Sequence, residues 1–108
     1  MYRFHFKNMP RSEALEVTLQ ERLEELTEKF HLEGRSHITA EIEAENRMDH
    51  AGKDVIKIKV LMTLGRSAPV IIQKKGKEAY HVMHELLDKF EYALSKKLKR
   101  RYQFAHAR

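Results

Sequence analysis

The stretch HITAEIEAENRMDHAGKDVIKIKVLMTL, residues 37–64, alternates apolar and polar side chains on both sides of a polar segment. In residues 37–45 and again in residues 55–64, an apolar side chain recurs at every second position. A period of two places successive side chains on opposite faces of a β-strand. The segment between the two runs, residues 46–54, is polar and contains Gly52, which is typical of a loop. The stretch therefore predicts two strands that each bury one face.

The residues on the N-terminal side of this stretch predict a further strand and a helix. Aromatic and basic side chains alternate through residues 2–7, which indicates a strand with one buried face. Ser12 is a favourable helix N-cap, and an apolar side chain then recurs every three or four residues, as on one face of a helix. This stripe consists of Leu15, Leu19, Leu23, Leu26 and Phe30. Gly34 marks the point by which we expect the helix to have stopped.

On the C-terminal side, the sequence predicts a turn, a short strand and a second helix. Gly65 and Pro69 bound the turn, residues 70–75 form the strand, and Gly76 ends it. We expect the second helix to begin near Glu78. Its apolar stripe consists of Tyr80, Met83, Leu87, Phe90, Leu94 and Leu98.

These elements follow one another in the order β-α-β-β-β-α. The helix between the first two strands makes them parallel neighbours with a right-handed crossover, whereas the last three strands form a meander. Because each helix has one apolar stripe, both helices should cover the same face of the sheet. We therefore predict an α+β fold, a two-layer sandwich of a four-stranded mixed sheet with two helices on one face. Residues 1–102 form a single domain in this interpretation, and residues 103–108 a short C-terminal tail.

Composition narrows the classes of function. The 108 residues include no cysteine, which excludes disulfides and thiol chemistry and suits the cytoplasm. No apolar run approaches the roughly 20 residues of a membrane span. Neither a G-x-S-x-G motif nor a glycine-rich phosphate loop is present, so we expect no enzyme activity, no cofactor and no small-molecule substrate. His81 and His84 are three residues apart on the second helix, but no third ligand has a recognisable spacing, so we expect no metal site.

Charge is distributed unevenly along the chain. Residues 1–54 contain 8 Lys and Arg against 12 Asp and Glu, whereas residues 55–108 contain 13 against 4. Such asymmetry is typical of a protein that presents one face to a polyanion, and it also occurs as an ordinary solubility pattern.

The uncovered sheet face is the first candidate for a polyanion site. It should carry basic residues from the strands at 2–7 and 55–64 and acidic residues from the strand at 37–45. If the acidic strand lies between the basic ones, opposite charges pair across the strands. The face also lacks the exposed aromatic pair of an RNA-stacking sheet. We therefore expect it to be largely neutralised.

The second helix is the stronger candidate for RNA binding. Its end, KKLKRR at residues 96–101, is almost purely basic, as phosphate binding requires, although a solvated helix end has the same composition. Tyr92 lies on the polar face, where it either stacks on an unpaired base or covers the methylenes of Lys89 and Lys96. Lys74, Lys75 and Lys77 form another basic cluster before the helix. The predicted RNA-binding residues are Lys74, Lys75, Lys77, Lys89, Tyr92, Lys96, Lys97, Lys99, Arg100 and Arg101.

Two segments resemble a known family. The first runs from Ser12-Glu13-Ala14-Leu15 through the apolar stripe to Phe30. The second comprises Gly76, Ala79-Tyr80, Met83, Leu86, Leu87, Asp88, Lys89, Leu94 and Lys96. With the order of elements, they resemble the ribosome hibernation-promoting factors and the related ribosome-associated inhibitor, the sigma-54 modulation family. By length the chain looks like the short form.

The resemblance implies a partner and a mechanism. Family members bind 16S rRNA in the decoding region of the small ribosomal subunit and block translation in stationary phase or stress. Their RNA contacts come largely from basic positions of the last helix, which Lys89 and Lys96 match here. Tyr92 stands where the family commonly has a basic residue, and Glu78 stands where it usually has Asp.

Two other functions remain open from the residues alone. The chain could be a generic binder of double-stranded or structured RNA, or a protein-interaction regulator that docks through its acidic first helix. The oligomeric state is not decided by the sequence pattern.

Overall fold

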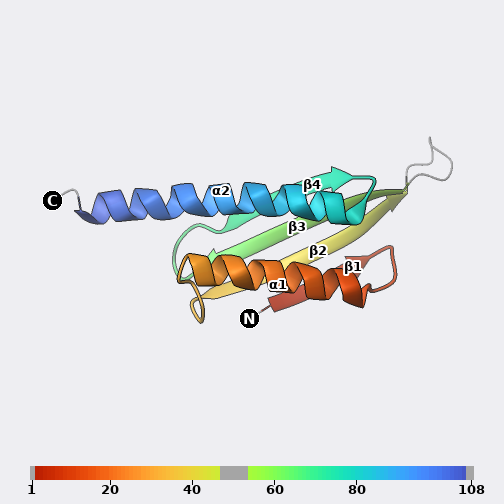
Figure 1. The fold of residues 1–108 in the computed structure, drawn as a ribbon, viewed down its shortest axis with the longest axis horizontal. Helices are drawn as coiled ribbons and strands as arrows, with labels where there is room; N and C mark the ends of the chain where they lie inside the picture. The colour runs from red at the N-terminus through yellow and green to blue at the C-terminus, as the bar shows by residue number, and fades with distance from the viewer. Residues whose placement is uncertain (1, 47–53, 107–108) are drawn as a thin grey trace.

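The computed structural model describes residues 2–46 and 54–106, and the side chains of residues 2–45 and 55–98 within them. The elements are β1 (Tyr2–Lys7), α1 (Glu13–Lys29), β2 (Ser36–Asn46), β3 (Asp54–Leu64), β4 (Val70–Gly76) and α2 (Ala79–His106). This order confirms the predicted one (Figure 1). The predicted loop at 46–54 falls mostly outside the described residues.

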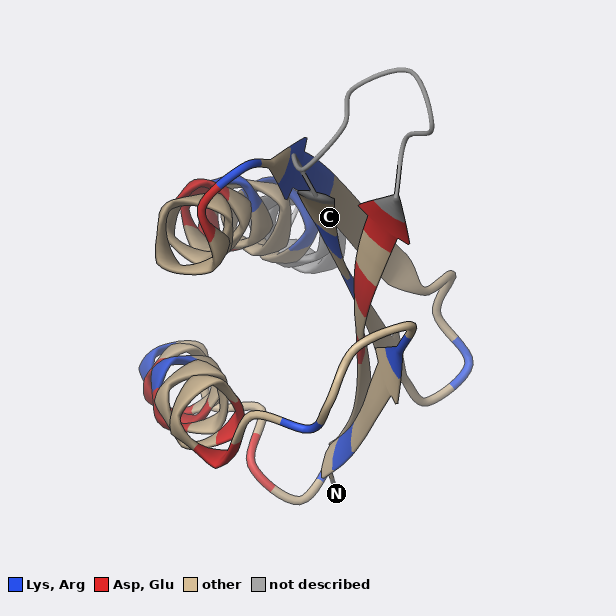
Figure 2. Cartoon of the chain, turned by 90° about the vertical axis from the view of Figure 1, so that its right-hand side faces the viewer, with Lys and Arg blue, Asp and Glu red and all other residues tan. Residues whose placement is uncertain are grey.

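The sheet has the predicted topology. Its strands lie in the order β1-β2-β3-β4, with β1 parallel to β2 and the other neighbours antiparallel. Both helices lie on one side of the sheet, as Figure 2 shows when the molecule is viewed from its end. The fold is therefore the expected two-layer α+β sandwich with one uncovered sheet face.

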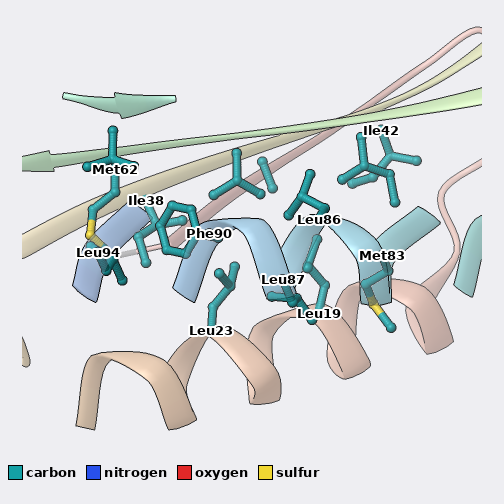
Figure 3. Packing of buried hydrophobic residues seen from close by; sticks show 14 of the residues in the cluster. Leu19, Leu23, Ile38, Ile42, Met62, Met83, Leu86, Leu87, Phe90 and Leu94 are labelled. Carbon is teal, nitrogen blue, oxygen red and sulfur yellow. The ribbon is translucent and has the colours of Figure 1, made fainter. Parts of the chain in front are cut away.

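The core fills the layer between the helices and the sheet (Figure 3). Leu15, Leu19 and Leu23 reach it from α1, and α2 contributes a longer row that includes the fully buried Phe90 and Leu94. The sheet supplies Ile38, Ala40, Ile42, Ile58, Val60 and Met62. One predicted member of the α2 stripe is wrong, because Tyr80 in the first turn is 40% exposed.

Helix α1 begins as predicted and ends differently. The Ser12 hydroxyl accepts a hydrogen bond from the Leu15 amide at 3.3 Å, which caps the N-terminus. At the other end, the amide of Leu32 donates to the Thr27 carbonyl and that of His31 to the Glu28 carbonyl. These two bonds form a Schellman motif, in which His31 rather than Gly34 takes the first left-handed conformation, with φ of 56°. The helix thus ends before Gly34, as expected, but its C-terminal motif is built at His31 and not at the glycine.

The junction between β4 and α2 is tightly built. The Glu78 carboxylate accepts hydrogen bonds from the amides of Tyr80 and His81, at 3.2 and 2.7 Å, so it caps the helix. Gly76 has no room for a side chain, because a Cβ at this position would lie 2.7 Å from Cγ2 of the buried Val82. A β-branched side chain is held in few rotamers and cannot easily move aside.

We expect Gly76→Ala to lower the free energy of unfolding by about 1–3 kcal/mol, as inserting a methyl group into a packed core does. Urea denaturation followed by circular dichroism would measure the loss. If the clash with Val82 is the cause, Gly76→Ala should cost less in a Val82→Ala background than in wild type. An equal cost in both backgrounds would assign the loss to the backbone instead.

Helix α2 is longer than the body that it covers. Its 28 residues span about 42 Å at 1.5 Å per residue. Leu94 is its last fully buried described side chain, Leu98 is half-buried, and the ribbon continues past the end of the sheet (Figure 1). The boundary at residue 102 stays a prediction, but α2 runs through His106 and makes most of the expected tail helical. No helix in the described part of the chain is long and apolar enough to cross a membrane.

Candidate nucleic-acid interface

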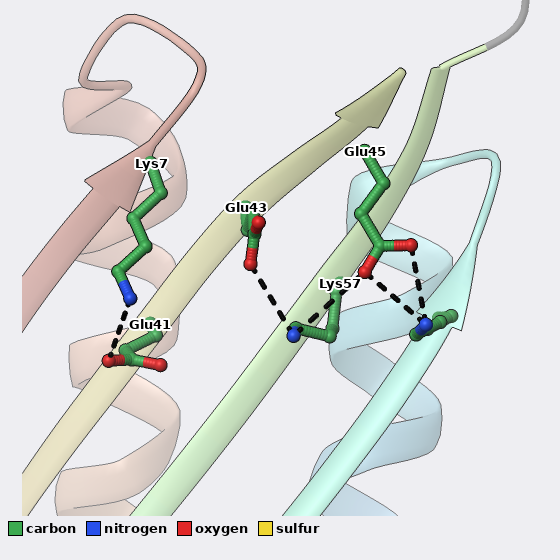
Figure 4. Close-up of polar contacts among 6 residues, drawn as sticks. Lys7, Glu41, Glu43, Glu45 and Lys57 are labelled. Carbon is green, nitrogen blue, oxygen red and sulfur yellow. Dashed lines mark hydrogen bonds and ion pairs between the residues drawn. The ribbon is translucent and has the colours of Figure 1, made fainter. Parts of the chain in front are cut away.

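The uncovered sheet face contains a ladder of ion pairs. Lys57 of β3 lies 3.4 Å from Glu43 and 3.9 Å from Glu45 of β2. Lys75 of β4 lies 3.3 Å from Glu45, and Lys7 of β1 lies 3.5 Å from Glu41 (Figure 4). The acidic strand lies between basic strands, as the predicted cross-strand pairing required.

Neutralisation of this face is substantial but incomplete. Within the described residues, Arg3 and Lys59 have no carboxylate at ion-pairing distance. The aromatic side chains of β1 do not add a stacking surface, because Tyr2, Phe4 and Phe6 pack against the core on the other face. The face therefore offers two isolated cations and no aromatic platform to a nucleic acid.

The outer face of α2 (Lys89, Tyr92 and Lys96) has the opposite character. All three side chains are exposed, and Tyr92 retains 63% of its accessible surface. The Lys96 ammonium lies 5.0 Å from the centre of the Tyr92 ring, in a cation–π contact. An exposed aromatic ring beside mobile cations is the combination that binds bases and phosphates of unpaired RNA.

The remaining basic residues of the helix divide into two groups. Lys97 lies about 100° around the helix from Lys96 and donates a hydrogen bond to the carbonyl of Ala68, in the turn between β3 and β4. Lys99, Arg100 and Arg101 follow in the helical backbone of α2, and their side chains lie outside the described residues.

The second predicted basic cluster does not act as one unit. Lys74 and Lys75 are consecutive in β4, so their side chains lie on opposite faces of the sheet. Lys74 is 3.6 Å from Glu85 of α2, whereas Lys75 pairs with Glu45. Lys77 is exposed and lies two residues before Ala79, where α2 begins, and Lys96 is about 26 Å along the helix from Ala79. Of this cluster, Lys77 is the residue left available to an outside anion.

The structure adds two basic residues that the sequence interpretation missed. Arg35 precedes β2 and Arg66 follows β3, and both line a recess of about 660 Å³ that also includes Leu98 of α2. The pairing of β2 with β3 could have revealed these two residues. Because β2 and β3 are antiparallel, with Ser36 opposite Leu64, the residues just outside both positions must lie close together.

The comparisons with known proteins concern the family and the fold. The sequence profile of the sigma 54 modulation protein / S30EA ribosomal protein family matches residues 2–102. The chain belongs to this family. No curated protein sequence matches it.

Solved structures with low sequence identity share the fold of this family member. A ribosomal subunit interface protein from Coxiella burnetii is 16% identical, with a TM-score of 0.73 over 91% of this chain and 97% of that one. The N-terminal domain of Thermus thermophilus Protein Y is 14% identical, with a TM-score of 0.67 over 89% and 96%. At these identities the likeness concerns the fold alone.

The two histidines considered for a metal site, His81 and His84, lie on the surface of α2. Nε2 of His81 is 2.8 Å from Oε1 of Glu85, one helical turn later. His84 is exposed beside the groove between the two helices. In the part of the chain that the structure describes, no three His, Asp or Glu side chains are grouped to hold a metal ion.

Proposed function

We propose that this protein binds 16S rRNA in the decoding region of the small ribosomal subunit, through α2, and thereby blocks translation under stress or in stationary phase. The mechanism is steric, because a rigid helix lying on rRNA in that region excludes mRNA and tRNA. Because the proposed partner is the ribosome, we expect the protein to act in the cytoplasm.

The observation that carries the proposal is the contrast between the two exposed surfaces. The sheet face neutralises most of its charge internally, whereas Lys89 and Lys96 on α2 have no carboxylate partner among the described residues. A lysine or arginine that binds an RNA phosphate releases counterions from the RNA. A side chain that is already paired with a carboxylate is less available for this contact, so phosphate binding favours α2.

Family membership supports the choice of partner. The profile that matches residues 2–102 describes an S30EA ribosomal protein, and the Coxiella burnetii neighbour is described as a ribosomal subunit interface protein. A ribosomal partner of this chain also explains why its basic surface is an extended helix and not a pocket.

Co-sedimentation with purified small subunits tests the proposal. We expect the protein to pellet with small subunits at low salt and to remain bound in a large excess of generic duplex RNA. A generic double-stranded RNA binder would be displaced by the duplex. No pelleting with small subunits at low salt would contradict the proposal.

Tyr92 provides a test of base stacking. We expect Tyr92→Ala to weaken binding to small subunits by about 5- to 150-fold, because stacking on an aromatic ring contributes about 1–3 kcal/mol per base. Tyr92→Phe keeps the ring and should bind within about twofold of wild type by the same reasoning. Equal affinities of the Ala and Phe variants, measured by filter binding, would show that the ring only covers its neighbouring lysines.

A further inference from the structure

A shallow hollow opens beside Tyr92, between the end of α1 and the middle of α2. It has a volume of about 400 Å³ and is lined by Lys29, Phe30, Asp88, Glu91, Tyr92 and Ser95. Small-molecule sites usually measure roughly 300–1,000 Å³, so a single nucleobase has room here. The hollow is contiguous with the outer face of α2, because Tyr92 belongs to both.

Two aromatic rings border the hollow, and the Lys29 ammonium lies 5.8 Å from the centre of one of them, that of Phe30. Phe30 is half-buried at the end of α1, and Tyr92 forms part of the opposite side from α2. The Lys96 ammonium lies 5.0 Å from the centre of the Tyr92 ring, and Lys96 is not one of the residues that line the hollow. A base stacked there would keep its phosphates beside the lysines.

The two carboxylates of the hollow differ in their availability. Oε1 of Glu91 is 2.6 Å from the Lys29 ammonium, so this carboxylate is already paired. Asp88, one turn before Tyr92 on α2, has neither a hydrogen bond nor an ion pair among the described residues. A free carboxylate repels phosphate, so its place beside a phosphate-binding face needs another explanation.

The donor pattern of one base supplies that explanation. An ionised carboxylate only accepts hydrogen bonds, and it has two oxygens side by side. Guanine presents two adjacent donors, N1–H and the N2 amino group, on its Watson–Crick edge. Adenine and cytosine each place an acceptor beside their amino donor, and uracil has one donor between two acceptors. Unpaired bases are commonly recognised on this edge while they stack on aromatic side chains.

We propose that the hollow binds an unpaired guanine of rRNA, which stacks on Tyr92 and donates N1–H and N2–H to the Asp88 carboxylate. This inference rests on the proposed function, because it names the base that the α2 surface reads. It also predicts that binding has a sequence requirement at one nucleotide, which phosphate contacts alone would not give.

Kethoxal probing of small subunits tests the inference, because this reagent modifies N1 and N2 of unpaired guanines. The wild-type protein and Asp88→Asn are compared at concentrations that give equal occupancy by co-sedimentation. We expect one 16S rRNA guanine to be protected by wild type and to recover reactivity at least about fivefold with Asp88→Asn, since one bidentate pair discriminates by that factor or more. Glu21→Gln removes the same charge from an exposed position of α1 outside the hollow and should protect like wild type.

The outcomes separate the two proposals. If wild type does not co-sediment with small subunits, the proposed function fails and the guanine site fails with it. If wild type co-sediments but no guanine differs between the wild-type and Asp88→Asn complexes, the guanine site alone is overturned. Loss of protection with Glu21→Gln as well would assign the effect to net charge and also overturn it.

Discussion

We expect Phe90→Ala to lower the free energy of unfolding by about 3–5 kcal/mol, the usual cost of truncating a buried phenylalanine. Phe90 has no accessible surface and lies on α2 in the layer between the helices and the sheet (Figure 3). Its removal leaves a cavity between α2 and the sheet. The packing of α2 on the sheet is what holds the outer face of α2 in place. The loss is large relative to the roughly 5–15 kcal/mol of a typical domain.

Urea denaturation followed by circular dichroism measures this effect, with Tyr92→Ala as the matched control. Tyr92 is an aromatic residue two positions later on the same helix, but it is 63% exposed. Its truncation should change the unfolding free energy by no more than about 0.5 kcal/mol. The two variants should therefore separate stability from RNA binding. A loss below about 1 kcal/mol for Phe90→Ala would contradict the packing described here.

The second large effect is expected from reversing charge at the end of α2. We predict that the triple variant Lys96→Glu, Lys99→Glu, Arg100→Glu binds small subunits at least about thirtyfold more weakly at low salt. Each lost phosphate contact also makes the negative slope of log affinity against log salt less steep. Losing three contacts should reduce the magnitude of this slope by about 2–3. Filter binding across a salt series measures both quantities.

A matched triple variant on the sheet distinguishes location from net charge. Arg3→Glu, Lys7→Glu, Lys59→Glu makes the same change in charge on the uncovered sheet face. We expect its salt slope to stay close to that of wild type. If the α2 variant instead binds like wild type, the acidic surface of α1 becomes the better docking candidate, as the protein-interaction alternative requires.

Much of the fold could be predicted because its elements are locally encoded. The alternation in residues 37–45 and 55–64 determines which face of each strand is buried, and this fixes the register within the sandwich. The end of α1 was not predictable in the same way. Left-handed backbone conformations favour glycine, yet His31 adopts one before Gly34 is reached, because the hydrogen bonds of the motif and the burial of Leu32 stabilise it.

The candidate site was only partly encoded in local patterns. The exposed positions of Lys89, Tyr92 and Lys96 follow from the helical period. Strand alternation also places Lys74 and Lys75 on opposite faces of the sheet. The prediction of one cluster of three lysines did not take this into account. The hollow depends instead on how α1 and α2 pack, because Phe30 and Asp88 are distant in sequence and become neighbours only in the folded chain.

Directed hydroxyl-radical probing tests the central claim, that α2 faces the rRNA of the small subunit. The sequence contains no cysteine, so a single introduced cysteine can hold an iron chelate at a known position. His81→Cys places the chelate on an exposed position of α2 outside the hollow, and Gln73→Cys places it on the uncovered sheet face at β4. We expect 16S rRNA cleavage in the decoding region from position 81 and much weaker cleavage there from position 73. Stronger cleavage of the decoding region from position 73, or cleavage from position 81 confined to other parts of the subunit, would contradict the claim.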